Sequence, residues 1–474
     1  MRWTNLWRLW YVSRGDFHHI ILELHKKYGP VVRLGPNLLD LDYPELTKTI
    51  YNTQGNWKKT EVYHGSSAHV GGKIVYNLFS ETSEHVHSQQ KRPIAKYYTA
   101  TAVSALEPHM DQMLERLCQI LAAKSVDDTD KAKVLDLGSW LSYFAWDVVG
   151  DISFSQPLGY LDKGCDFDGT LAIADKATDY FSLVGCMPFL DYLLEKNPLV
   201  RPFISPRFAR ITGVSLKHLM DRYAGKDGGY HDASKPDYLD HFLEAKKLYP
   251  NVVDDAQIIS YLMINMGAGA DTTAITLRAV FYYALKNPAV WAKLEEEVLA
   301  VGHAVPLSLK DARRLPYLDA VIKEAMRVHP AIGMTLERYV PPGGLHLPLG
   351  HNGGPSLVPA GTMVGLNPWV VHRNRDAYGE EADAFRPERW LRDENETEDE
   401  FRGRLRRMND ASLAFGAGGR SCIGKHISIM EIYKAVPSLI AKFQFELDES
   451  AAEWRTVNSW FVRQTGIKVR MRTR

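Results

Sequence analysis

The stretch FGAGGRSCIGKH, residues 415–426, places a cysteine inside a turn crowded with glycine. The turn contains the four glycines Gly416, Gly418, Gly419 and Gly424. Backbone without side chains lets a large flat molecule come close, and its N–H groups stabilise the charge of a metal-binding thiolate. Arg420, two residues before Cys422, is placed to bind an anionic group at the edge of that molecule. The stretch therefore predicts a thiolate that ligates a metal.

A phosphate-binding loop is the competing interpretation of a glycine-rich turn ahead of a helix. The pattern G-x-G-x-x-G fails here because Ser421 stands at the third glycine position, and no G-K-[ST] is present. A different pattern, F-x-x-G-x-R-x-C-x-G, is matched at every specified position. Those positions are Phe415, Gly418, Arg420, Cys422 and Gly424.

This second pattern is the signature of the cytochrome P450 haem-thiolate monooxygenases, which the chain resembles. The resemblance implies that Cys422 is the axial ligand of the iron of haem b and that Arg420 pairs with a haem propionate, with Phe415 in the same cofactor-binding turn. Thiolate ligation pushes electron density onto the iron and favours O–O cleavage. Within the family the chain resembles the fungal pisatin demethylase-like group, through FGAGGRSCIGKHIS and FSQPLGYL.

The segment KEAMRVHP, residues 323–330, places Glu324 and Arg327 three residues apart, on one face of a helix. Taken alone, such a pair is most often a solvated ion pair at the surface. The resemblance implies instead that both side chains turn inward and pair with Arg389 of FRPERW, residues 385–390. This triad would hold the cysteine-bearing loop, which is a structural role.

The segment MGAGADTTAITL, residues 266–277, contains two glycines inside an apolar run with helical spacing. One interpretation is close helix packing, with a threonine hydroxyl bonded back to a carbonyl. The resemblance implies a second, in which a break in the long helix across the haem makes room for dioxygen. Thr272 then hydrogen-bonds the dioxygen and Asp271 relays protons from solvent.

Further basic side chains match positions that bind haem propionates in the family. Where the family commonly has W-x-x-x-R on an early helix, this chain has His87 and Lys91, although the alignment could also select Arg92. A lysine binds an anion as a point charge and not through a fork. Arg338 in LERYV matches another propionate-binding arginine of the family.

Length and composition describe a globular protein. The 474 residues are 45% hydrophobic and 24% charged, and 57 Lys and Arg balance 57 Asp and Glu. This balance gives no support to nucleic acid as a partner and favours a neutral, apolar ligand. Four cysteines without C-x-x-C spacing indicate a reducing, cytosol-facing setting.

The pattern along the chain predicts one catalytic domain over residues 1–474 with a mainly α fold. We expect a hairpin at 31–42, helices from 43 to about 330, a last helix at about 427–443 and a β-like tail. A large helical body with a smaller β-rich portion formed from both ends of the chain is the simplest architecture, and it is the P450 fold that the resemblance implies.

The first 24 residues form a possible membrane-surface segment. MRWTNLWRLWYV, residues 1–12, is either an amphipathic segment at the headgroup level or a helix that packs its tryptophans on its own domain. No run of 18 apolar residues is present. Members of the group usually begin with an anchor helix ahead of a segment like this one, so we expect the cytosolic face of the endoplasmic reticulum membrane, with the anchor missing from this chain.

The resemblance implies a monomeric monooxygenase that takes electrons from NADPH through an NADPH-cytochrome reductase. It would insert one atom of O2 into a lipophilic small molecule, by hydroxylation or O-demethylation, in fungal secondary metabolism. The alternatives are a haem-thiolate peroxygenase or isomerase, and a haem sensor without activity. The pocket would be lined by segments that are apolar or aromatic, although each could be ordinary core: 63–79, 181–190, 263–270, 331–335, Trp460 and Phe461. Four basic residues could meet the reductase or be a solvated charge run: Arg404, Arg406, Arg407 and Lys425.

Overall fold

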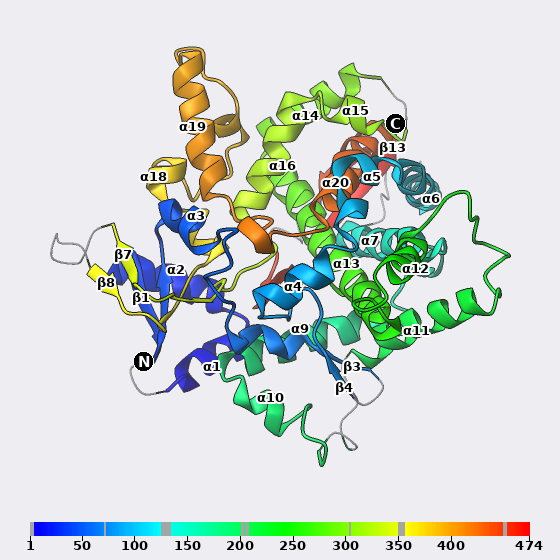
Figure 1. The fold of residues 1–474 in the computed structure, drawn as a ribbon. Helices are drawn as coiled ribbons and strands as arrows, with labels where there is room; N and C mark the ends of the chain where they lie inside the picture. The colour runs from blue at the N-terminus through cyan, green and yellow to red at the C-terminus, as the bar shows by residue number, and fades with distance from the viewer. Residues whose placement is uncertain are drawn as a thin grey trace.

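The fold has a large helical body on one side and a smaller, β-rich part on the other (Figure 1). The structure is a computed structural model that describes residues 4–70, 73–124, 134–200, 203, 208–302, 305–348, 356–448 and 453–474. Within these ranges the expected mainly α architecture, with a β-rich portion built from both ends of the chain, is confirmed.

The α-helices of the described residues are α1 (Leu6–Ser13), α2 (Phe17–Tyr28), α3 (Thr47–Ile50), α4 (Glu84–Lys91), α5 (Ala100–Ser104), α6 (Glu107–Lys124), α7 (Leu137–Phe154), α8 (Tyr160–Lys163), α9 (Thr170–Cys186), α10 (Phe189–Leu193), α11 (Ala209–Tyr223), α12 (Tyr238–Leu248), α13 (Asp255–Lys286), α14 (Pro288–Ala300), α15 (Leu309–Ala312), α16 (Pro316–Val328), α17 (Pro368–Val371), α18 (Arg375–Tyr378), α19 (Glu398–Ala411) and α20 (Lys425–Lys442). The strands are β1 (Val31–Gly35), β2 (Leu38–Leu41), β3 (Ala68–Val70), β4 (Lys73–Val75), β5 (Leu135–Asp136), β6 (Arg338–Tyr339), β7 (Leu345–Leu347), β8 (Ser356–Val358), β9 (Met363–Leu366), β10 (Phe443–Leu447), β11 (Thr456–Ser459), β12 (Phe461–Gln464) and β13 (Lys468–Thr473).

Helix α13 is the axis of the helical body. Asp254 caps its first turn by accepting a hydrogen bond from the Gln257 N–H, and it ends one residue before Asn287-Pro288, because the proline begins α14. Helix α7 packs along it, and at Gly269 a Cβ would lie 3.2 Å from a methyl group of Val149. Helix α13 runs without interruption through residues 266–273, so the expected break for dioxygen is wrong.

The main sheet joins the two ends of the chain. Strands β1 and β2 form the predicted antiparallel hairpin, and β2 then pairs in parallel with β9, which pairs with β6. A second sheet has the order β10-β13-β5, and β11 and β12 form a hairpin. Strand β6, which contains Arg338, is therefore joined through β9 to the N-terminal strands β1 and β2.

The N-terminal segment packs one tryptophan on its own domain and leaves another exposed. Trp7 packs on its own domain against Tyr11 and Phe17, whereas the Trp10 side chain is 62% exposed. Residues 1–3 lie outside the described residues. Within the ranges given above, none of the helices has both the length and the apolar character needed to cross a bilayer.

Candidate functional site

The loop between α19 and α20 presents Cys422 just before the first residue of α20. The Cys422 N–H donates to the Phe415 carbonyl at 2.8 Å, which closes the loop on itself. Gly416 and Gly418 both have a φ of +64°, in the left-handed region. At Gly418 a Cβ would lie 1.8 Å from the Tyr51 carbonyl oxygen, so no other residue fits this backbone.

The thiol of Cys422 is under opposing electrostatic influences. Burial is the largest and raises the thiol pKa, while the backbone N–H groups of Gly424 and Lys425 and the ammonium groups of Lys91 and Lys425 lower it. The side chain is nevertheless accessible. N–H groups and cations aimed at a sulfur favour its thiolate form.

The carboxylate of Glu324 on α16 is fully buried and accepts five hydrogen bonds. Arg327 donates two of them, from Nη2 at 2.8 Å and from Nε at 2.9 Å, and Nε of Arg389 donates one at 2.9 Å. The Arg386 N–H and the Trp390 indole complete the set at 2.8 and 2.9 Å. The three side chains named from the sequence therefore meet, and Trp390 of the same FRPERW stretch joins them.

His372 links this cluster to the cysteine loop, and sequence reasoning missed it. Its Nδ1 lies 3.2 Å from the Arg327 carbonyl, and its Nε2 accepts the Leu413 N–H at 2.8 Å. Burial lowers the pKa of His372 to about 3, so the ring is neutral and can donate at one nitrogen while it accepts at the other. The Leu413 carbonyl in turn accepts the Gly416 N–H. Both protein partners of His372 are backbone groups, which carry no signal in a sequence.

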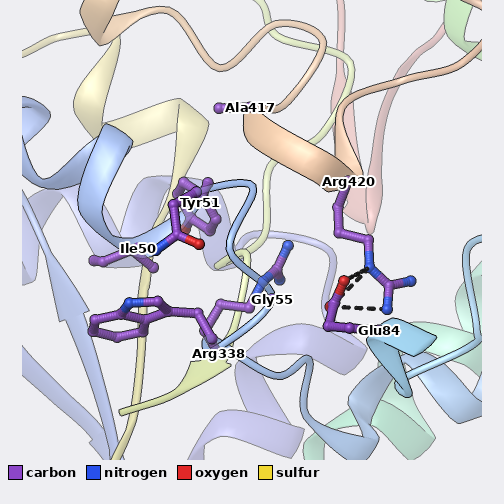
Figure 2. Close-up of a pocket in the computed structure, with 9 residues that line it drawn as sticks. Ile50, Tyr51, Gly55, Glu84, Arg338, Ala417 and Arg420 are labelled. Carbon is purple, nitrogen blue, oxygen red and sulfur yellow. Dashed lines mark hydrogen bonds and ion pairs between the residues drawn. The ribbon is translucent and has the colours of Figure 1, made fainter. Parts of the chain in front are cut away.

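Arg420 lies at the other end of the same loop, beside a small cleft that Arg338 also lines (Figure 2). Its Nε donates to the Glu84 carboxylate at 2.9 and 3.0 Å, and its Nη1 donates to the Glu81 carbonyl at 2.7 Å. Its Nη2 lies 2.9 Å from a Glu84 oxygen but is buried without an aligned hydrogen bond. Glu84, at the start of α4, was another residue that the sequence did not single out.

The remaining residues predicted to bind propionates each make different contacts in this region. Nη1 of buried Arg338 donates to the Tyr63 hydroxyl at 3.1 Å. His87 is buried, and its pKa is lowered to about 3 by burial first and then by the cations around it. Lys91 donates to the Gly419 carbonyl at 3.1 Å, so it holds the cysteine loop directly.

Asp271 and Thr272 lie on α13, which packs against α20. The Trp146 indole donates to Asp271 at 2.9 Å. The pKa of Asp271 is raised to about 7, by burial first and then by Asp175, against the Trp146 hydrogen bond, Arg278 and Arg463, which lower it. The Thr272 hydroxyl donates to the Ala268 carbonyl at 2.8 Å, which is the back-bonded arrangement.

Thr273 ties this part of α13 to the cysteine side of the site. Its Oγ1 lies 3.0 Å from Oγ of Ser428, which is in the first turn of α20. The same hydroxyl donates to the Gly269 carbonyl at 2.9 Å. The Asp-Thr-Thr segment and the residues that follow Cys422 are therefore held side by side.

Four aromatic side chains from separate parts of the chain form one cluster: Tyr63, Phe79, Phe181 and Trp460. Their ring centroids lie 4.9–5.9 Å apart in edge-to-face pairs. Trp460 has a φ of +75°, which is rare for a large side chain and fixes its direction. Met334 and Phe461 belong to the same apolar core as Tyr63, Phe181 and Trp460.

The predicted lining segment 263–270 packs mainly elsewhere. Met263, Met266 and Ala270 belong to the core of the helical body, and Thr212 of α11 donates to the Met263 sulfur at 3.1 Å. Residues 71 and 72 of the first segment, 63–79, lie outside the described residues.

The four basic residues expected to face a redox partner differ in their exposure and in their contacts within the protein. Arg404 donates to Glu396 and to the carbonyls of Arg389 and Leu391, so it is engaged within the protein. Arg406, Arg407 and Lys425 are exposed.

Comparison with known proteins gives a family and several relatives. Residues 2–470 match the model of a family described as "Cytochrome P450". The chain is 45% identical over 472 residues to "Cytochrome P450 monooxygenase cfoH" of Aspergillus candidus, which covers 99% of this chain and 86% of that protein. It is 36% identical over 475 residues to "Cytochrome P450 monooxygenase cicH" of Emericella nidulans, which covers 99% and 92%. A cytochrome P450 monooxygenase of Aspergillus terreus is 37% identical over 450 residues, 93% of this chain and 88% of its own.

Replacing Glu324 by alanine is expected to lower the free energy of unfolding by about 3–5 kcal/mol, because two buried guanidinium groups lose their counter-charge. Denaturant unfolding followed by tryptophan fluorescence measures the change. Glu23→Ala is the matched control, since Glu23 pairs with Lys26 at the surface, with the two side chains 68% and 63% exposed, and such pairs contribute about 0–1 kcal/mol. Equal stability of the two variants would contradict this account of the cluster.

Proposed function

The chain belongs to the cytochrome P450 family, and from that premise we propose that it is a haem-dependent monooxygenase acting on a lipophilic small molecule. It takes up O2 and receives electrons from a redox partner, as the family does. One oxygen atom enters the substrate, by hydroxylation or O-demethylation, and the other leaves as water. The observation that carries this proposal is the geometry of the Cys422 loop, which the Cys422 N–H closes on the Phe415 carbonyl and which Lys91 holds at the Gly419 carbonyl.

The residues of the site fit a haem. Cys422 supplies an accessible thiol, which is the ligand that the iron of a haem-thiolate protein needs. Buried Nη2 of Arg420 makes no aligned hydrogen bond and is a ready donor for a propionate. Cys422 would ligate the iron, and Arg420, Arg338, His87 and Lys91 would lie at the propionates. When bound, the haem supplies the oxygen-activating chemistry.

Two groups on α13 are assigned to proton delivery. With its pKa raised to about 7, Asp271 holds a proton at neutral pH and can release it without a large barrier. The Thr272 hydroxyl can accept a hydrogen bond from a proton donor while its own proton is held by the Ala268 carbonyl, or turn and donate in its place. Trp146 orients the Asp271 carboxyl.

The cluster of Tyr63, Phe79, Phe181 and Trp460 supports an apolar or aromatic substrate. We assign this cluster to one wall of the substrate pocket, with Met334 and Phe461 packed against it. A fungal secondary metabolite is the substrate class we propose, because the relatives named above are fungal monooxygenases of the same length range.

For the electron supply we propose NADPH and a cytochrome reductase. Arg406, Arg407 and Lys425 are exposed near the cysteine loop and would meet an acidic flavoprotein surface. Arg404 is left out of this surface because it is engaged with Glu396.

We further propose a monomer that rests on the cytosolic face of the endoplasmic reticulum membrane. Helices α1 and α10 both pack against α9 and lie at the same edge of the molecule (Figure 1). Each exposes large apolar side chains there, Leu6 and Trp10 on α1 and Phe189 and Leu193 on α10. Tryptophan at a membrane surface sits at the headgroup level.

The absorption spectrum of the purified protein, reduced and exposed to carbon monoxide, is expected to show the strongly red-shifted Soret band of thiolate-ligated haem. Cys422→Ala removes that band, whereas Cys165→Ala, which changes an exposed free cysteine, leaves it in place. A band typical of histidine-ligated haem in the wild-type protein would refute the proposed function. Turnover with peroxide but none with reductase and NADPH would restrict it to a peroxygenase.

Thr272→Ala is expected to leave the carbon monoxide spectrum unchanged while less product forms for each NADPH consumed, because the hydroxyl no longer assists protonation. Product and NADPH are measured together, with a lipophilic substrate chosen by its effect on the Soret band. Thr276→Ala is the matched control, since it removes a hydroxyl bonded to the Thr272 carbonyl one turn further along α13. If the two variants formed equal amounts of product per NADPH consumed, the role assigned to Thr272 would be wrong.

The amount of product formed per NADPH consumed is expected to depend on pH through the protonation of Asp271. Its pKa is raised from 3.8 to about 7, so the proton is held below about pH 7 and lost as the pH rises through that value. Product formed per NADPH should therefore fall through about pH 7 in the wild-type protein. Asp271→Asn should lower turnover by about 10²-fold or more at low pH and abolish this limb of the profile. An unchanged limb in the variant would assign the titration to another group.

A further inference from the structure

Lys59 is a buried lysine beside the site that the signature motifs do not point to. It lies between α3 and the Tyr63 segment, and its backbone forms an antiparallel bridge with Arg338. The next hydrogen bond along this pairing runs from the Tyr339 N–H to the Lys58 carbonyl at 2.9 Å. Lys59 is only 5% exposed, while Lys58 is exposed. The two neighbouring lysines therefore have opposite surroundings.

The ammonium group of Lys59 is poorly satisfied for a buried cation. Its Nζ donates to the Phe79 carbonyl at 2.5 Å and lies 3.7 and 4.4 Å from the ring centroids of Tyr63 and Phe79. Over the described ranges no carboxylate forms an ion pair with it. An ammonium has three N–H donors, and a buried charge without a counter-ion is costly.

The charges around Lys59 are of both signs, and the two cations act more strongly than the two carboxylates. Burial, and then the guanidinium groups of Arg338 and Arg420, lower the pKa of Lys59 well below its ordinary value, while Glu84 and Glu81 oppose them. The Glu84 carboxylate is already bound by Arg420 through Nε and Nη2. An anion that entered between these side chains would be strongly stabilised, and it would keep Lys59 protonated.

The free donors in this place suit an anion with two oxygen atoms. Lys59 has unused N–H groups, and among the described residues Arg338 donates only through Nη1. Nη2 of Arg420 makes an unaligned ion pair with Glu84, so a carboxylate in better alignment would compete for its N–H groups. We infer that Lys59 is a carboxylate-binding residue of this site, acting together with Arg338 and Arg420. This inference rests on the proposed haem site, of which it adds a further residue.

Two sources could supply the carboxylate. A haem propionate would approach from the side of Arg338 and Arg420, where the cleft of Figure 2 lies. A carboxylate carried by the substrate would approach from the side of Tyr63 and Phe79, which belong to the aromatic cluster. In both cases the ammonium group of Lys59, which lies over the rings of Tyr63 and Phe79, would meet a carboxylate oxygen, so the chemistry of recognition is the same.

The experiment compares Lys59→Met with Lys59→Arg in the haem-loaded protein, and Lys58→Met is the matched surface control. Methionine keeps the length and removes the charge, and arginine keeps the charge. The carbon monoxide spectrum is recorded first for all four proteins. A thiolate band in all of them shows that the haem site is intact and separates this test from that of the proposed function, which fails only if the wild-type protein lacks the band.

The first arm measures the rate at which haem leaves for an excess of apomyoglobin, and the midpoint potential of the iron, without substrate. If Lys59 binds a propionate, Lys59→Met speeds haem loss by about tenfold or more and shifts the potential, while Lys59→Arg restores most of both. Lys58→Met leaves both unchanged.

The second arm titrates the ferric protein with 4-phenylbutyrate and with its methyl ester, followed by the Soret band. If Lys59 binds a substrate carboxylate, Lys59→Met weakens binding of the acid by about tenfold or more and leaves that of the ester unchanged. A change in either arm that Lys59→Arg rescues supports the inference and identifies the source.

The melting temperature of the apoprotein distinguishes a ligand-binding role of Lys59 from a role in protein stability alone. Because Lys59→Met removes a buried cation without a counter-ion, it is expected to raise the melting temperature of the apoprotein or leave it unchanged. If Lys59→Met lowers the melting temperature and alters neither haem retention, potential nor acid binding, or if Lys59→Arg behaves as Lys59→Met does in both arms, the inference is overturned.

Discussion

The fully buried carboxylate of Glu324 is the interaction on which the rest of the site depends. It pairs with both Arg327 and Arg389, and those two guanidinium groups use their other N–H donors on backbone carbonyls of residues 372–384. A buried ion pair is expensive to desolvate, and it becomes stable only when every lone pair and proton is used. Arg327 meets this condition with all five of its N–H groups, so helix α16 and an irregular chain segment are locked to one another. His372 passes this order on to Leu413 and thus to the cysteine loop.

Around Arg420 the opposite condition holds. Lys59, Arg338 and Arg420 lie close together, and Glu84 is the carboxylate that contacts Arg420. The lowered pKa values of Lys59, His87 and Arg420 all have burial as their first cause. An arrangement that costs folding energy is typical of a place prepared for a ligand, because the ligand brings the charge that completes it. The Glu324 cluster stabilises the fold, whereas the like charges beside Arg420 destabilise it. The two are connected, because a rigid loop is needed to hold like charges close together.

The α13 side of the site is organised by packing more than by charge. Helix α13 is continuous, and its threonine hydroxyls are satisfied by carbonyls one turn earlier. Gly269 allows α7 to come within contact, and α7 carries the Trp146 indole that meets Asp271. Burial of the Asp271 carboxyl between α13 and α7 excludes water from it and raises its pKa. A residue that is ordinary in sequence thus acquires a proton affinity suited to neutral pH.

The sequence by itself determined the family, the mainly α fold and the hairpin at 31–42, because these depend on local spacing: glycines around Cys422, apolar periodicity, and Asn-Pro and Gly-Pro punctuation. It also named Glu324, Arg327 and Arg389, since the family pattern records which side chains meet. Only the tertiary structure decided which groups surround them. His372 works through backbone atoms, Glu84 reaches Arg420 across 336 positions of the chain, and Lys59 differs from Lys58 only in burial. Contacts between distant segments, and the loss of water that changes a pKa, arise when the chain closes on itself, and neither is encoded in local spacing.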